Sequence, residues 1–149
     1  MNAVAQTIFM DHVPAGEAEE WVNDGRAEAG DCLRACVASV IELPLESVPH
    51  FAQYRQPADS HLWWWALVGF CFAHGWDVTY ETEAPEAIAI ASGKSVRGHG
   101  HVVVVDNGLL VHDPHPSGDG LCEVDGYYAF ARLPAVPPKE GSNDALSSL

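Results

Sequence analysis

The pattern of apolar and polar positions changes along the chain, from a helical period in the first half to strand-like runs in the second. After Gly30 and Asp31, apolar residues recur every three or four positions, which predicts an amphipathic helix that Pro44 ends. Asp31 is a favourable N-cap residue for this helix. The predicted buried face consists of Leu33, Cys36, Val37, Val40 and Ile41.

Other segments of the first half are also predicted to be helical. Residues 15–23 favour a short helix, and LPLESVPHF favours one further short helical turn. Residues 60–75 predict a longer helix, with Ser60 as a possible cap and Gly75 at its end. This helix is apolar nearly all round, so we expect it to be well buried. The helix contains three consecutive tryptophans, Trp63, Trp64 and Trp65. Because successive helical residues point in different directions, we expect one or two of them in the core and the remaining one at a cleft or partner surface.

The second half carries the signals of β-strands. The run HVVVVD is apolar throughout, and Asn107 and Gly108 follow it directly, which is the strongest short signal for a tight hairpin. Helices followed by mostly antiparallel strands predict an α+β fold. The predicted strands cover residues 76–82, 101–106, 109–113 and 126–133.

Length and charge narrow the possible classes of protein. A chain of 149 residues with 48% hydrophobic residues predicts one domain over residues 1–133, including an acidic segment at 1–29, and a flexible tail at 134–149. No apolar run approaches the ~18 residues of a membrane span, and the N-terminus lacks the features of a signal peptide. We therefore expect a cytoplasmic protein without a membrane partner. A net charge of -14 without a basic stripe argues against binding to nucleic acid.

The helix that follows Asp31 contains two cysteines in different positions. Cys36 lies on the predicted buried face and is expected in the core. Cys32 is the first helical residue and lies off that face. The positive end of the helix dipole is expected to lower the pKa of a thiol there, as a nucleophile requires. Position alone does not distinguish a nucleophile from an ordinary cysteine.

A nucleophilic thiol needs a base, and the base needs an orienting partner. With a two-residue turn, Asp106 pairs with Leu109, which places 101 opposite 114 and 102 opposite 113. His101 and Asp113 then become diagonal neighbours at the open end of the hairpin. His112 is an alternative base, but it points to the other side of its strand from Asp113.

These residues resemble a known family. The pattern D-C-x-x-A-C before an apolar helix, then H-V-V-V-V and D-P-x-P-x-G, is similar to the papain-like cysteine peptidases of the bacteriocin-transporter type, the C39-like group, in its standalone bacterial and phage versions. The resemblance covers about residues 26–118 and implies a papain-like fold and a hydrolase of peptide or amide bonds. It further implies a catalytic triad with Cys32 as nucleophile, His101 as general base and Asp113 as orienting residue, and no cofactor.

Two positions depart from the pattern of this family. Arg26 stands six residues before the nucleophile, where the family has the Gln of the oxyanion hole, and Leu33 stands where it usually has Gly. Arg26, the nearby Asn23 or a backbone N–H group are therefore the alternatives for stabilising the oxyanion. The residues expected to form the oxyanion hole or the substrate groove are Arg26, Asp31, Leu33 and Gly100.

Other functions fit parts of the same sequence. A papain-like binding module without activity is favoured by the two departures, and an acyltransferase would use the same triad. The histidines of the hairpin region, with Cys32 or Cys36, could bind zinc, although no metal ligand is assigned. Those histidines are His99, His101, His112 and His115.

Overall fold

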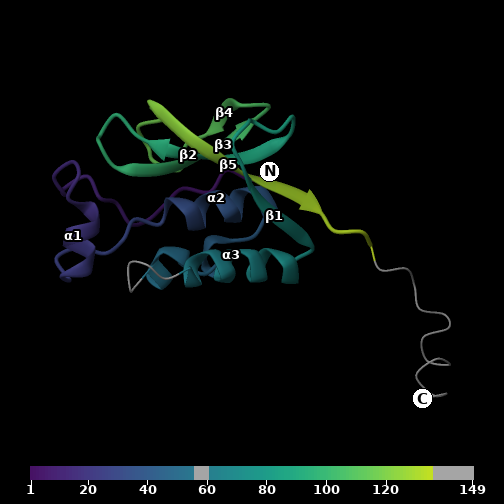
Figure 1. Ribbon diagram of the computed structural model, residues 1–149, viewed down its shortest axis with the longest axis horizontal. Helices are drawn as coiled ribbons and strands as arrows, with labels where there is room; N and C mark the ends of the chain where they lie inside the picture. Colours follow the sequence, from purple (N-terminus) through teal and green to yellow (C-terminus); the bar gives the residue numbers. More distant parts are fainter. Residues whose placement is uncertain (56–60, 136–149) are drawn as a thin grey trace, which may run out of the picture.

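Helices precede strands throughout the part of the chain that the computed structural model describes, residues 1–55 and 61–135 (Figure 1). This order confirms the expected mixture of helices and antiparallel strands. The predicted cap Ser60 and most of the predicted tail, residues 136–149, lie outside the described residues. The helical elements are α1 (Ala18–Asn23), α2 (Cys32–Ile41), the 3-10 helices η1 (Leu45–Ser47) and η2 (Phe51–Arg55), and α3 (Leu62–Ala73). The strands are β1 (Trp76–Glu81), β2 (Ile88–Lys94), β3 (Gly100–Asp106), β4 (Leu109–His112) and β5 (Glu123–Arg132).

The strands form one antiparallel sheet in the order β1-β5-β2-β3-β4. Its middle strand, β2, is absent from the sequence prediction, which assigned no element to residues 83–100. The sequence IAIASGK explains the omission, because alanine, glycine and lysine are all depleted in strands. Its pairing with both β3 and β5 nevertheless joins the two halves of the sheet.

Helix α2 lies between the sheet and α3 (Figure 1). Its residues from Ala35 to Val40 are buried on every side, and Cys36 and Val37 are fully inaccessible to solvent. They pack in one core with apolar residues of β2 and β3. The predicted buried face and the core position of Cys36 are thus confirmed. The helix ends earlier than predicted, because Glu42 takes a left-handed conformation with φ of 60° before Pro44 is reached.

Helix α3 forms the outer layer of the molecule (Figure 1). The prediction that it is well buried is wrong for its outer face, where Leu62, Trp65 and Phe72 are more than half exposed. The sheet and α2 cover only one side of this apolar helix, and Leu67 and Cys71 are its fully buried residues. Among the described residues, no helix combines the length and apolar character that a membrane span requires.

The hairpin between β3 and β4 contains the feature that most affects the candidate site. Asn107 and Gly108 both have positive φ, as a tight primed turn requires, and Asp106 pairs with Leu109 as predicted. Beyond the turn, Val105 pairs with Leu110 but Val104 pairs with His112. Val111 is therefore an extra residue, a β-bulge, and the predicted register beyond it is wrong.

The bulge reverses the face to which the following residue points. In the predicted register, 113 lies opposite 102 and shares its face, while 101 points to the other face. In the observed register, His112 shares the face of Val104, so Asp113 shares the face of His101. The extra residue therefore brings the carboxylate to the imidazole.

Candidate active site

His101 and Asp113 form a buried hydrogen-bonded pair. The His101 Nε2 atom lies 2.7 Å from Asp113 Oδ1, and their side chains are 4% and 1% exposed. Asp113 also accepts hydrogen bonds from the backbone N–H groups of His115 and Gly120, each at 2.9 Å. An ionised carboxylate can only accept, so Nε2 carries a proton. Nδ1 of the neutral imidazole is then its basic nitrogen.

Cys32 lies at the same end of β3, as the first residue of α2. The backbone N–H groups of Val102 and Leu33 lie close to its thiol and act to lower its pKa. The thiol is thus next to the peptide bond that joins His101 to Val102. One turn further, the thiol of Cys36 donates to the Val102 carbonyl over 3.6 Å. These contacts fix the beginning of α2 against the beginning of β3.

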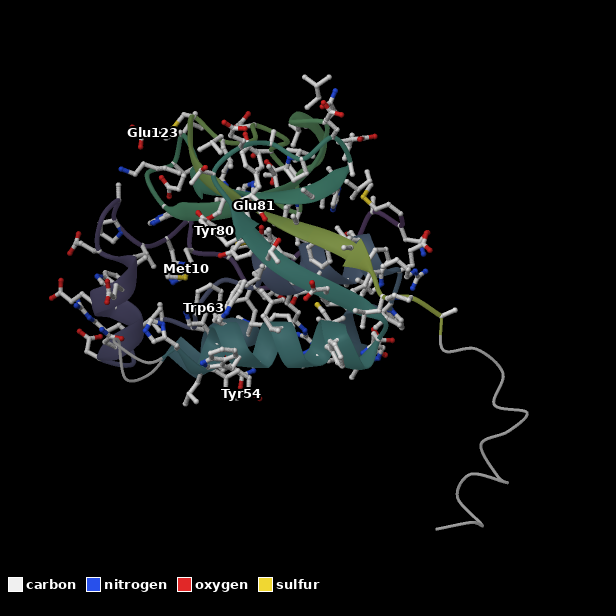
Figure 2. All side chains as sticks on the ribbon, turned by 45° about the vertical axis from the view of Figure 1, so that its right-hand side comes forward. Met10, Tyr54, Trp63, Tyr80, Glu81 and Glu123 are labelled. Carbon is white, nitrogen blue, oxygen red and sulfur yellow. The ribbon has the colours of Figure 1, made fainter. Side chains whose placement is uncertain are left out.

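A cavity of about 620 Å³ opens beside the thiol. Cys32 and His101 both line it, together with residues of α1, α3, β2, β5 and the N-terminal segment. Two of these residues, Met10 and Trp63, lie near one another between α1, α3 and the sheet in Figure 2. The volume is in the range of small-molecule and peptide sites.

Burial determines the protonation of the thiol and the imidazole. It raises the pKa of Cys32 above its ordinary value, and the backbone N–H groups of Val102 and Leu33 only partly offset this. It also lowers the pKa of His101, against the opposing effect of the Asp113 carboxylate. The sequence prediction of a lowered pKa for Cys32 is therefore wrong, because desolvation outweighs the favourable position at the helix start. At neutral pH both groups are uncharged in the free protein.

Asp113 remains ionised in spite of its surroundings. Burial acts to raise the pKa of its carboxyl, but the hydrogen bonds from His101, Gly120 and His115 outweigh burial and leave this pKa below its ordinary value. A carboxylate with several hydrogen-bond donors is a stable acceptor for an imidazole N–H. It holds His101 in the tautomer whose Nδ1 can accept a proton.

The lowered pKa of His101 predicts that the stability of the protein falls below pH ~6.5, the ordinary pKa of histidine. Below that pH the unfolded chain binds a proton that the folded protein binds only at lower pH. Stability present above pH ~6.5 is therefore lost as the pH falls toward the folded pKa. Urea unfolding between pH 8 and 5 checks this prediction. We expect a smaller pH dependence in His101→Gln, and an equal dependence in both proteins would contradict it.

The structure separates the other predicted site residues into two groups. Leu33 and Gly100 line the cavity, as does Asn23. Arg26 is not among the lining residues: its guanidinium lies 2.8 Å from Asp24 on the surface. Arg26 is therefore not placed to stabilise an oxyanion at Cys32.

Asp31 is buried completely, and its side chain contacts the N-terminal segment and does not line the cavity. Its carboxylate accepts hydrogen bonds from the backbone N–H groups of Thr7 and Ile8, both at 2.8 Å, and from the Thr7 hydroxyl at 2.7 Å. It makes no side-chain hydrogen bond to the start of α2, so the expected capping bond is wrong. Asp31 instead attaches residues 7–8 to the start of α2.

This attachment places Gln6 in the cavity, a residue that sequence reasoning missed. Gln6 is 7% exposed and lines the cavity with Cys32. Its Nε2 donates to the Ile8 carbonyl at 2.9 Å, which leaves a second N–H on the same amide. No local pattern links Gln6 to Cys32, because a tertiary contact through Asp31 brings them together.

The remaining histidines of the hairpin region have different environments. The His112 Nε2 donates to the Val4 carbonyl at 2.7 Å, and the His115 Nε2 lies 2.9 Å from the Asp11 carboxylate. His99 is 8% exposed and lines the cavity. Within residues 1–55 and 61–135, no three histidine, cysteine or acidic side chains form a group that could hold a metal ion.

Comparison with known proteins gives no further identification of the site. No model of a protein family, no curated protein and no solved structure matches the chain. The resemblance to C39-like peptidases stays a prediction from the sequence motifs. The functional interpretation depends on the geometry described above.

Proposed function

We propose that the protein is a cysteine-dependent hydrolase of peptide or amide bonds, with a papain-like arrangement of the C39-like type. The observation that carries the proposal is the buried His101–Asp113 pair, whose Nε2–Oδ1 distance is 2.7 Å, on the same cavity as Cys32. The thiol, the imidazole and the cavity of about 620 Å³ lie together at one end of β3. A nucleophile, a base and an orienting carboxylate are the groups that acyl transfer requires.

The geometry supports a reaction in two steps. Cys32 Sγ attacks the carbonyl carbon while its proton passes to His101 Nδ1, and Asp113 stabilises the imidazolium that forms. The C–N bond then breaks, and His101 gives the proton to the leaving amine. In the second step His101 removes a proton from water as the water oxygen attacks the thioester carbon. The C–S bond then breaks, the acid leaves, and His101 returns the proton to Cys32 Sγ. The reaction needs no cofactor.

In this proposal Gln6 takes the oxyanion role for which the sequence left Arg26, Asn23 or a backbone N–H group as alternatives. The oxyanion of the tetrahedral intermediate would accept hydrogen bonds from the backbone N–H of Cys32 and from the second N–H of the Gln6 amide. Gln6 is held beside Gly30, where a Cβ atom would lie 3.9 Å from its Nε2. Donors that are fixed before the reaction stabilise developing charge most effectively.

Acylation by p-nitrophenyl acetate tests the proposal. We expect a burst of p-nitrophenol and one acetyl group on Cys32, found by peptide mass mapping, with less on the exposed Cys122. His101→Ala should slow acylation of Cys32 by about 10²- to 10⁴-fold, the usual contribution of a general base. The rate should rise with pH with a midpoint below ~6.5, because burial lowers the pKa of His101.

The matched control is Cys36→Ala, which removes the other thiol of α2 and should leave acylation of Cys32 intact. Equal acylation of Cys32 in the original protein and in His101→Ala would contradict the proposal. So would a folded protein whose Cys32 is not acylated, and the cavity would then be a binding site without catalysis. Transfer of the acetyl group to an added amine in preference to water would make the enzyme an acyltransferase.

A further inference from the structure

One wall of the cavity is aromatic. Trp63 and Tyr128 both line it, and their ring centroids lie 6.3 Å apart in an edge-to-face arrangement. Tyr80 supports this wall from behind, with its ring centroid 5.1 Å from that of Tyr128. In Figure 2, Trp63 comes from α3 and Tyr80 from β1. Aromatic faces attract organic cations.

The charged residues that line the cavity have an excess of negative charge. Three carboxylates line it, from Asp11, Glu19 and Asp125, against one guanidinium, from Arg97. The Arg97 Nε lies 3.6 Å from Asp11 Oδ1, so these two charges balance one another. Within the described part of the chain, Glu19 and Asp125 form no ion pair. They are exposed at the rim, on α1 and β5.

His99 has a buried polar atom beside the cavity that lacks a hydrogen-bond partner within the described ranges. The residue is 8% exposed and lines the cavity, yet its Nδ1 is buried and has no hydrogen-bond partner among the described residues. Its carbonyl is held by the Ser95 N–H at 3.0 Å, which fixes the backbone beside the site. Buried polar atoms usually have a partner. Turning the imidazole toward the cavity would let an N–H group of a bound molecule supply one.

From these three features we infer that the substrate carries a cationic group, an ammonium or a guanidinium as in lysine or arginine, close to the bond that Cys32 attacks. The inference rests on the proposed function. The cation would lie between the aromatic wall and the two rim carboxylates, where cation–π and Coulomb attraction act together. Because the whole chain has a net charge of -14, the test must separate this local site from the general field of the protein.

Charged methanethiosulfonates provide that test, because they modify a thiol without any catalytic turnover. The probes are the trimethylammonium-ethyl reagent and the sulfonato-ethyl reagent, each of which forms a mixed disulfide with Cys32 and releases methanesulfinate. Peptide mapping gives the modification rate of Cys32 by each probe, and the ratio of the two rates measures the preference for a cation. We expect Glu19→Gln and Asp125→Asn each to lower this ratio roughly fivefold, as loss of one nearby charge should.

The matched control is Asp77→Asn, which removes one exposed carboxylate of β1 that does not line the cavity. It changes the net charge equally and should leave the ratio almost unchanged. Trp63→Leu should lower the reactivity toward the cationic probe, and Trp63→Phe should retain it. An equal effect of Asp77→Asn, or no effect of the two rim substitutions, would overturn the inference. Failure of the proposed function would appear separately, as absent acylation by p-nitrophenyl acetate.

Turnover gives a second, direct measurement once acylation has been shown. Peptide pairs that differ only by lysine or norleucine at one position should differ in kcat/KM, with lysine preferred at the position that reaches the rim. Asp125→Asn should reduce this preference, whereas the control Asp77→Asn should leave it almost unchanged. Equal kcat/KM for every pair would overturn the inference while the hydrolase itself stands.

Discussion

Asp31→Ala is expected to lower the free energy of unfolding by about 3–5 kcal/mol, because three buried donors lose their acceptor at about 1–3 kcal/mol each. The carboxylate is fully buried and accepts three hydrogen bonds of 2.7–2.8 Å from Thr7 and Ile8. Its loss leaves those donors without an acceptor in the interior. Urea unfolding followed by tryptophan fluorescence measures the effect.

Asp24→Ala is the matched control for this prediction. Asp24 also forms short contacts, 2.8 Å to the Arg26 guanidinium, but it lies on the surface. Exposed ion pairs contribute only about 0–1 kcal/mol, so the control should unfold almost as the original protein does. A cost below about 1 kcal/mol for Asp31→Ala would mean that the N-terminal segment is not held by this carboxylate.

Asp113→Asn is expected to slow acylation of Cys32 by p-nitrophenyl acetate by about 10²- to 10⁴-fold, the range in which loss of an orienting carboxylate reduces catalysis elsewhere. An asparagine amide has one accepting oxygen, whereas the carboxylate of Asp113 accepts from His101, His115 and Gly120. A neutral amide also lacks the charge that would stabilise the imidazolium formed when His101 takes the proton of Cys32.

The pH profile separates this role from a purely structural one. Asp113→Asn should lower the plateau of the acylation rate in a protein that still gives a cooperative urea transition. Asp119→Asn changes an exposed carboxylate of the same loop and should leave the plateau unchanged. An unchanged plateau in folded Asp113→Asn would limit Asp113 to holding the loop that contains His115 and Gly120.

Local signals in the sequence account for the parts of the fold that were predicted correctly. Helix α2 follows from the spacing of its apolar residues, and the β3–β4 turn follows from Asn107 and Gly108. Strand β2 escaped prediction because its alanines, glycine and lysine do not favour a strand by themselves. Pairing with β3 and β5 stabilises it, and such pairing is invisible in a local window.

The candidate site shows the same division between local and tertiary information. Cys32 could be placed at a helix start from the apolar pattern, and His101 at the same end of the hairpin as Asp113 from the turn. The β-bulge that puts the two side chains on one face could not be predicted. The shift in the pKa of the Cys32 thiol could not be predicted, because its direction depends on burial by distant segments. The position of Gln6 in the cavity also depends on a tertiary contact, the hydrogen bonds of Asp31 to residues 7–8.

The bulge at Val111 makes the site sensitive to the length of the β3–β4 hairpin more than to its composition. Leu109, Leu110 and Val111 are all exposed, so new side chains can replace theirs at little cost to packing. Deletion of any one of them would restore a regular ladder and turn Asp113 to the opposite face from His101. For protein engineering, the hairpin can therefore be redesigned or extended only by changes that keep the extra residue of the β-bulge. In evolution, substitutions at residues 109–111 would be tolerated, whereas single-residue deletions in this hairpin would be selected against.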